Sequence, residues 1–209
     1  AAPSVVTVCS DCSACAGASV IEIPNSVTSI GDHAFQACTS LKSTVIPISV
    51  TSIGSYAFDS CSSLANVSIG NSVTSIDDYT FQSCSSLAVI VIPDSVITIA
   101  GGVFRFCSSL TNVTFGNAVA TIGQSAFYGC KMTNVIIPTS VTSLGWRSFY
   151  SCSKLTSVII PNSVTSIASE LLHGGSSLTR VSIPNSDTSI GDRSFKSCSS
   201  LTSVSIPNL

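Results

Sequence analysis

Hydrophobic positions recur along this chain with a period of 23 residues. In each period an apolar run is closed by Pro or Gly, at Pro24, Pro47, Gly70, Pro93, Gly116, Pro138, Pro161, Pro184 and Pro207. Consecutive closing residues lie 23 positions apart, except for one step of 22 between Gly116 and Pro138. A repeat of this length is typical of a solenoid, in which each repeat is one supersecondary unit stacked on its neighbours.

Five apolar columns run through the repeats. In the first complete unit they are occupied by Ile23, Val27, Ile30, Phe35 and Leu41. One repeat cannot bury so many large side chains alone, so stacking must place each of them on its counterpart in the next repeat. The pattern therefore predicts one continuous core that contains a ladder of phenylalanine rings.

The segments 67–69 and 181–183 alternate apolar and polar residues and are rich in β-branched side chains, which favours short strands. Identical strands one repeat apart pair in parallel, about 4.8 Å from each other. The segment 31–38 is too short for a long helix, so we expect one α or 3₁₀ turn there. The predicted fold is an α/β solenoid, with a parallel β-sheet on one face and short helical or 3₁₀ turns on the other.

The repeats define one solenoid domain over residues 23–209, preceded by an N-terminal capping segment over residues 1–22. The chain stops within a repeat, at Ile206–Leu209, and no polar capping unit follows. Solenoids normally need a polar end, so we expect either that the chain is a fragment or that end-to-end self-association or a partner covers this end.

Charged residues make up 9% of the chain, against roughly 25% in ordinary globular proteins, and the net charge is −2. This balance gives no electrostatic reason to expect nucleic acid as a partner. No apolar run approaches the roughly 18 residues of a membrane span, so no transmembrane segment is expected.

Catalytic chemistry is not predicted. His33 and His173 are the two histidines, and they lie six repeats apart. The chain contains no nucleophile-elbow, phosphate-loop or paired-carboxylate motif. We therefore expect a protein that is not an enzyme and that holds no cofactor and no metal.

Eight of the ten cysteines occupy one column, at Cys15, Cys38, Cys61, Cys84, Cys107, Cys130, Cys152 and Cys198. We interpret the column as buried, reduced thiols that fill small core positions. Cys9, Cys12 and Cys15 form a C-x-x-C-x-x-C pattern, in which a Cys9–Cys12 disulfide would pin the cap. Free thiols and a metal site remain alternatives, although a fourth metal ligand is missing.

Two surfaces are candidates for partner binding. On the strand face, exposed apolar residues are expected among hydroxyl-bearing ones, at Val45, Val89, Val91, Ile136 and Ile159. On the opposite side the candidates are Tyr128, Trp146, Arg147 and Tyr150, since aromatic residues with arginine are typical of binding hot spots. Plain β-propensity and an aromatic ladder that covers the core are the respective alternatives.

Two glycosylation sequons, at Asn66 and Asn112, lie two repeats apart in one column of the strand face. Sugars on these residues would block part of that face if the chain were secreted by a eukaryote. Chance occurrence in a repeat rich in Asn, Ser and Thr is the alternative.

The motif Leu64-x-x-Val67-x-Ile69-Gly-x-x-Val73-x-x-Ile76, followed by Phe81-x-x-Cys84-x-x-Leu87, resembles the BspA-like, or Treponema-type, leucine-rich repeat. The resemblance extends over residues 23–209. It implies a leucine-rich repeat solenoid of the kind shared by surface proteins, with adhesion to host or matrix proteins as the associated role.

The resulting hypothesis is a non-catalytic protein-binding or adhesion module, extracellular or at a cell surface. One alternative is a structural subunit that stacks end to end or docks within a larger assembly. A remote alternative is ice binding by a threonine column that Ile97 and Ala120 interrupt, formed by Thr28, Thr51, Thr74, Thr142, Thr165 and Thr188.

Overall fold

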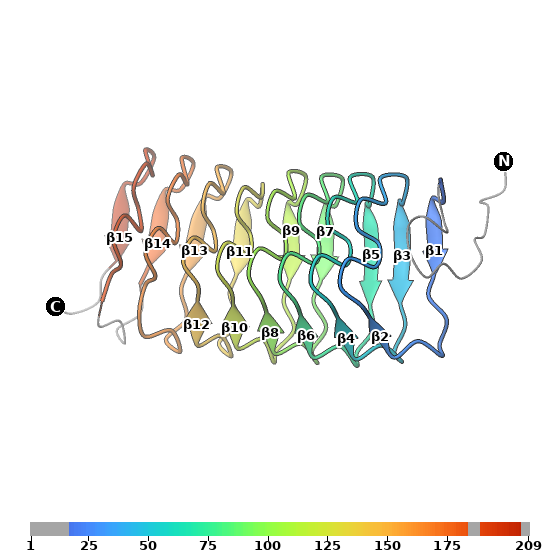
Figure 1. Cartoon of the computed structure of the whole chain (residues 1–209). Helices are drawn as coiled ribbons and strands as arrows, with labels where there is room; N and C mark the ends of the chain where they lie inside the picture. Colours follow the sequence, from blue (N-terminus) through green and yellow to red (C-terminus); the bar gives the residue numbers. More distant parts are fainter. Residues whose placement is uncertain (1–16, 184–188, 206–209) are drawn as a thin grey trace.

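Each repeat contributes one longer strand to a parallel array, because its alternating apolar residues need one buried and one exposed side. The computed structural model describes residues 17–183 and 189–205, and there the expected parallel solenoid is confirmed (Figure 1). The longer strands are β1 Val20–Glu22, β3 Ser43–Ile46, β5 Asn66–Ile69, β7 Val89–Val91, β9 Asn112–Thr114, β11 Asn134–Ile136, β13 Ser157–Ile159, β14 Arg180–Ser182 and β15 Ser203–Ser205.

Equivalent residues of successive longer strands pair in register. Ile46 of β3 lies beside Ile69 of β5, for example, and Val135 of β11 lies beside Val158 of β13. The ladder is interrupted between β5 and β7 and again between β9 and β11, where neighbouring strands belong to different sheets. The second interruption falls in the repeat that is one residue shorter than the others.

A second series of strands, which the sequence analysis did not predict, forms one six-stranded parallel sheet. Its members are β2 Ser29–Ile30, β4 Ser52–Ile53, β6 Ser75–Ile76, β8 Thr98–Ile99, β10 Thr121–Ile122 and β12 Ser143–Leu144. Each has two residues, one half-exposed or exposed and one buried. Two residues are too few for an alternating pattern to be recognised in a sequence.

Each repeat forms one full turn of the solenoid, here called a coil. On the remaining side of each coil, the backbone differs in detail from the expected α or 3₁₀ turn. In the second complete repeat, Ala57 and Asp59 donate backbone hydrogen bonds three residues back, to Gly54 and Tyr56. The intervening residues Phe58 and Ser60 instead donate to Thr80 and Gln82 of the next repeat, at 2.8 Å each. Because alternate N–H groups point along the solenoid axis, a helix cannot form. Each coil therefore bonds to its neighbour on this side as well.

This alternation requires left-handed backbone conformations at fixed positions. One column with positive φ contains His33, Tyr56, Tyr79, Gly102, Ser125, Arg147, Glu170 and Arg193, with φ between 54° and 61°. A second contains Ala37, Ser60, Ser83, Phe106, Gly129, Ser151, Gly174 and Ser197. Glycine adopts such angles without strain, whereas other residues adopt them at a cost.

The core is the predicted stack of equivalent side chains. Phe35, Phe58, Phe81, Phe104, Phe127 and Phe149 are buried, and their rings stack with centroids 5.1 to 5.7 Å apart. Offset stacks of this kind contribute about 0.5–1.5 kcal/mol each beyond the burial itself. Leu172, which replaces Phe in the next repeat, is also buried, so the core continues past the ladder.

β1 lies within the segment expected to form a cap, and it pairs with β3 as an ordinary rung of the solenoid. Residues 1–16, 184–188 and 206–209 lie outside the described ranges, and with them Cys9, Cys12, Thr188 and the chain end. Within the described ranges, no helix has the length and apolar character that crossing a membrane demands.

Candidate functional site

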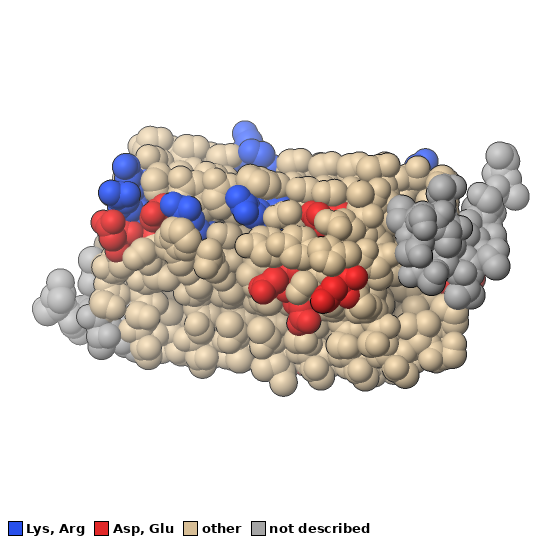
Figure 2. Space-filling model, in the orientation of Figure 1, with Lys and Arg blue, Asp and Glu red and all other residues tan. Residues whose placement is uncertain are grey.

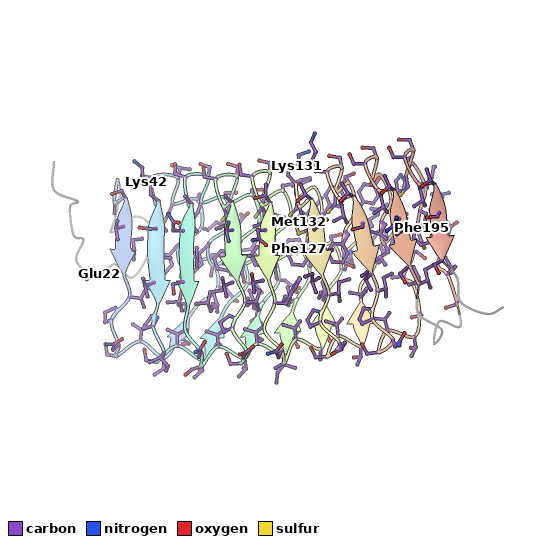
Figure 3. All side chains as sticks on the ribbon, turned by 180° about the vertical axis from the view of Figure 1, so that it is seen from behind. Glu22, Lys42, Phe127, Lys131, Met132 and Phe195 are labelled. Atoms are coloured by element: carbon purple, nitrogen blue, oxygen red, sulfur yellow. The ribbon has the colours of Figure 1, made fainter. Side chains whose placement is uncertain are left out.

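The strand face is the outer surface of the longer strands, seen from in front in Figure 3. Side chains alternate along a strand, so every second residue points outward and forms a column with its counterparts. Four of the apolar candidates occupy one outward column and are largely exposed: Val45 at 61%, Val91 at 58%, Ile136 at 85% and Ile159 at 69%. Val89, in the neighbouring outward column, is 49% exposed.

Register decides which of these residues are neighbours. Ile136 pairs directly with Ile159, so the two most exposed candidates lie side by side. Val45 lies between Glu22 and Ser68, and Val91 pairs with Thr114. The structure therefore brings together Ile136 and Ile159, and it keeps Val45 apart as an isolated residue.

A groove of about 530 Å³ opens on this face between β9 and β11, beside Ile136. Its lining combines amide and hydroxyl groups with apolar atoms, from Asn112, Thr114, Phe115, Asn117, Asn134, Ile136, Pro138 and Thr139. The groove lies where the sheet is interrupted. In this short repeat the backbone hydrogen bonding to the preceding repeat also differs from that of the other repeats, since the Lys131 N–H donates to the carbonyl of Leu110.

Sequence analysis did not find this groove, although a signal was present. The 22-residue step between Gly116 and Pro138 marks the repeat whose coil must fit its neighbours with one residue fewer. Asn134, the first residue of β11, and Thr139, three residues after its end, both line the groove. A change in repeat length is thus a sign of an irregular surface on the strand side.

The turn face is the surface formed by the turn segments, opposite the longer strands and in front in Figure 2. On it Tyr56 stacks on Tyr79 and Tyr128 stacks on Tyr150, with centroids 4.9 and 4.7 Å apart. Phe106 meets Tyr128 edge to face, and His173 lies against Tyr150. The rings form one continuous cluster across the repeats from Phe106 to His173.

Arg147 is held within this cluster by three groups. Its guanidinium lies 4.0 Å from the centroid of the Trp146 ring and 5.1 Å from that of Tyr150. It also donates two hydrogen bonds to the carboxylate of Glu170, at 3.0 and 3.2 Å. These bonds lower the pKa of Glu170 and raise that of Arg147, since each stabilises the charged form of both partners.

The nine candidate binding residues therefore lie on two surfaces. Val45, Val89, Val91, Ile136 and Ile159 belong to the strand face, while Tyr128, Trp146, Arg147 and Tyr150 belong to the turn face. The core separates the two sets, so one flat partner surface cannot contact both. Trp146 is 38% exposed, and the three other turn-face candidates are half-buried.

The two sequons lie on the strand face. Asn66 on β5 and Asn112 on β9 are both exposed, and Asn112 lines the groove. A glycan on Asn112 would occupy the groove that Ile136 borders.

Among the described residues the cysteine column is buried as expected from Cys38 to Cys152, Cys198 is half-buried, and one expectation needs correction. Cys61, Cys84, Cys107, Cys130, Cys152 and Cys198 are free thiols, and each donates a hydrogen bond to the carbonyl of the Phe or Leu 25 or 26 residues earlier. Cys38 is disulfide-bonded, so the expectation that the whole column is reduced was wrong. Burial raises the pKa of Cys107 to about 12, which makes that thiol unreactive.

Asp59 and His33 of the turn face contact the neighbouring repeats. The buried Asp59 carboxylate accepts hydrogen bonds from the amides of Gln36 and Gln82, one repeat before and one after it. His33 stacks on Tyr56, far from His173 along the solenoid. Within the part of the chain that the structure describes, no group of three His, Cys, Asp or Glu residues could hold a metal ion.

The threonine column is exposed at Thr28, Thr51, Thr74, Thr142 and Thr165. The hydroxyls of Thr51 and Thr142 donate to the carbonyls of Thr28 and Ala120 in the preceding repeats. The O–H donors of Thr51 and Thr142 are therefore used within the protein.

Comparison with known proteins agrees with the repeat geometry. The family described as BspA type leucine rich repeat region, with 6 copies, matches residues 10–132 and 120–209. No curated protein matches the chain.

Three solved structures share the fold. A leucine rich cell surface protein from Faecalibacterium prausnitzii is 32% identical with a TM-score of 0.69, and the match covers 90% of this chain and 60% of that one. The T. pallidum leucine rich repeat protein is 25% identical with a TM-score of 0.63, covering 89% and 79%. The pneumococcal vaccine antigen PcpA, at 21% identity and a TM-score of 0.65, covers 90% and 60% and shows the fold alone.

This chain thus spans less than two thirds of the length of the Faecalibacterium protein, and the resemblance lies in the repeats themselves. The matched family extends over nearly every residue, and the columns that define it form the core described above. The chain belongs to the BspA type leucine-rich repeat family.

Proposed function

We propose that this protein is a non-catalytic binding module of a surface or extracellular leucine-rich repeat protein, and that it contacts a protein partner through the strand face. The observation that carries the proposal is the in-register pair Ile136 and Ile159, 85% and 69% exposed beside the groove. Leaving two large β-branched side chains in water gains nothing for folding, whereas burying them against a partner is favourable.

The composition of the strand face supports a partner that is recognised by shape and apolar contact. In the outward columns of the described longer strands, the charged residues are Glu22 on β1 and Arg180 on β14, near the two ends. Between them the face carries Ser, Thr, Asn, Val and Ile. Asn112 and Asn134 offer amide donors and acceptors at the edge of the groove, next to the apolar pair. Binding here depends little on salt, because no charge pairs form.

The proposed surface location draws on the Faecalibacterium relative, which is described as a cell surface protein. The Asn, Ser and Thr that replace charged residues on the exterior fit a protein that meets its partner by contact rather than by long-range attraction. Host or matrix proteins are the partner classes that the family resemblance implies, and matrix proteins are the class chosen for the test.

The test is retention of the protein on immobilised extracellular-matrix proteins, measured by biolayer interferometry. The variant I136T/I159T removes the apolar pair and keeps β-branched residues, and Thr114 already occupies the same column. We expect its affinity to fall at least about tenfold, as for loss of a hot spot. The turn-face variant W146A is the control and should bind like the unmodified protein. Equal binding by I136T/I159T and the unmodified protein would exclude this placement.

A further inference from the structure

A backbone hydrogen bond of the regular solenoid is missing between the neighbouring strands β9 and β11 (Figure 1). In other repeats the N–H group that follows a longer strand donates to the next strand at 2.8 to 3.1 Å, as Ile92 does to Thr114, Ile160 to Ser182 and Ile183 to Ser205. The equivalent bond, from the Phe115 N–H to the Ile136 carbonyl, is not formed, and both residues line the groove. Backbone groups normally find a partner, so this donor and this acceptor are available to a ligand.

Three exposed asparagine amides surround this gap. Asn112 and Asn134 are the first residues of β9 and β11, and Asn117 lies three residues after the end of β9. The Asn134 Oδ1 accepts a hydrogen bond from the Thr156 hydroxyl at 3.2 Å, which holds this amide in place and leaves its NH₂ group as a donor. Because an amide side chain both donates and accepts, the lining suits a ligand whose groups do the same.

The groove also has an apolar wall. Phe115 occupies a column in which the neighbouring repeats have Ile92 and Ile137, and it is half-buried, whereas both isoleucines are buried. Ile136 and Pro138 add aliphatic surface beside the ring. The volume of about 530 Å³ lies within the roughly 300–1,000 Å³ of small-molecule sites, which combine an apolar lining with a few polar groups. The groove therefore has the size and the lining of a small-ligand site.

Charge at the groove favours a neutral ligand. Its lining, which lies wholly within the described residues, contains no Asp, Glu, Lys or Arg. The charged group that is bonded to a lining residue is the exposed Asp94, whose Oδ1 accepts a hydrogen bond from the Asn117 N–H at 2.8 Å. A carboxylate beside the groove repels an anion, and no cation of the lining offsets that repulsion.

The distance between the two strands decides against an extended peptide. A peptide that joins a sheet pairs its backbone with the edge of a strand, about 4.8 Å away. A strand inserted between β9 and β11 would hold their Cα atoms about 9.6 Å apart, which is twice that spacing. Residues of β9 and β11 instead have Cα atoms within 8 Å of each other. The gap thus admits single polar groups of a ligand, such as a hydroxyl, and not a further strand.

We propose that the groove between β9 and β11 binds a neutral saccharide. One hydroxyl of the sugar replaces the missing sheet bond, since a hydroxyl can accept from the Phe115 N–H and donate to the Ile136 carbonyl. Other hydroxyls bond to the amides of Asn112 and Asn134, and the C–H face of the sugar ring packs on the apolar wall. The site takes a free glycan or the sugar chain of a glycoprotein by the same chemistry, so it does not depend on the protein contact of the proposed function.

Binding to an array of immobilised glycans tests the proposal, with the chain produced without N-glycosylation so that Asn112 is unmodified. We expect retention on neutral glycans that end in galactose, mannose or N-acetylglucosamine, and none on glycans that end in sialic or uronic acid. Titration of the chain with the retained sugar in free form should then shift the backbone amide signal of Phe115 in NMR spectra and leave that of the buried Phe35 unchanged. Retention of no neutral glycan, or of acidic glycans alone, would overturn the proposal.

Variants locate the contact. N112A/N134A removes two exposed amides from the groove, so it should fold and should bind the free sugar at least about tenfold more weakly. N66A is the matched control, because Asn66 is exposed in the same column on β5 and lies outside the groove lining, and it should bind normally. Undiminished binding of the sugar by N112A/N134A would contradict the proposed site.

Two further measurements separate this site from the protein contact. I159T changes a residue outside the groove lining, so it should weaken binding to a matrix protein and keep binding to the free sugar. A matrix protein whose glycans have been removed enzymatically identifies the source of the ligand: weaker binding assigns the groove to the partner's sugar chain, and equal binding assigns it to a separate glycan. If no sugar binds while I136T/I159T still loses the matrix protein, the saccharide site is wrong and the proposed function stands.

Discussion

Ile136 of β11 lies directly beside Ile159 of β13 in parallel register, and both side chains point into solvent. The same pair of strands buries Val135 against Val158 one residue earlier, on the core side. Alternation along the strand thus assigns two adjacent apolar pairs to opposite surfaces. The inner pair stabilises the fold, whereas the outer pair remains available for a partner.

Removing the outer pair should leave folding unchanged. We expect I136T/I159T to unfold in urea with a free energy within about 0.5 kcal/mol of the unmodified protein, because exposed substitutions away from special backbone positions have small effects. The comparison with V135T/V158T, which places hydroxyls in the core, should show a loss of several kcal/mol. If the two double variants lose the same stability, the assignment of inner and outer pairs is wrong.

Removing one ring from the phenylalanine ladder should be costly. Phe127 is fully buried, stacks between Phe104 and Phe149, and meets Phe115 edge to face. Phe127→Ala should lower the free energy of unfolding by about 3–5 kcal/mol, through lost burial and the cavity left behind. Phe106→Ala, at a ring that is 44% exposed, should lower it by far less in the same urea titration. Equal losses would contradict a continuous stacked core.

The ladder and the parallel strands could be predicted because each repeat places the same residue type at the same position. The backbone structure of the turn face could not be predicted in this way, since it depends on the direction in which each N–H group points. Ala57 and Phe58 follow each other in sequence, yet one bonds within its coil and the other bonds to the next coil. No residue type signals that choice. Ser and Ala occupy several of the positive-φ positions, where a glycine would have indicated a left-handed backbone conformation in the sequence.

Ser83 tests the left-handed column. Its φ is 58°, and the equivalent residues Gly129 and Gly174 have φ of 76° and 77°. Ser83→Val should destabilise the protein by about 1–2 kcal/mol, because a β-branched side chain is strained at positive φ. Ser83→Gly should be neutral or slightly stabilising, since relief of strain offsets the greater flexibility of the unfolded chain. Thermal unfolding distinguishes them, and a valine variant as stable as the glycine variant would contradict the assigned backbone conformation.

Stability should fall at high pH because of the cysteine column. Burial raises the pKa of Cys61, Cys107 and Cys152 from the ordinary 9.0 to about 12. Below pH 9 both the folded and unfolded chains keep these thiols protonated. As pH rises from about 9 to about 12, the unfolded chain loses protons that the folded chain retains, so unfolding becomes easier, by about 1.4 kcal/mol per thiol and pH unit.

Urea unfolding at a series of pH values measures this effect. The variant C107A lacks one buried thiol and should show a shallower decline of stability with pH than the unmodified protein, whatever its stability at neutral pH. Identical slopes for the two proteins would show that Cys107 does not stay protonated in the fold.

The candidate surfaces were predicted in part. Outward positions on the strands follow from alternation, so Ile136 and Ile159 could be named from the sequence. The groove beside them could not, because it arises from the fit of the short coil around Lys131 against its neighbours.

The most direct test of the binding proposal is cross-saturation from a bound matrix protein to the isoleucine methyl groups of this chain, observed by NMR. If the strand face is the contact, the methyl signals of Ile136 and Ile159 lose intensity, while those of the buried Ile53 and the indole signal of Trp146 do not. Loss of intensity at Trp146 with Ile136 and Ile159 unaffected would place the partner on the turn face and contradict the proposal.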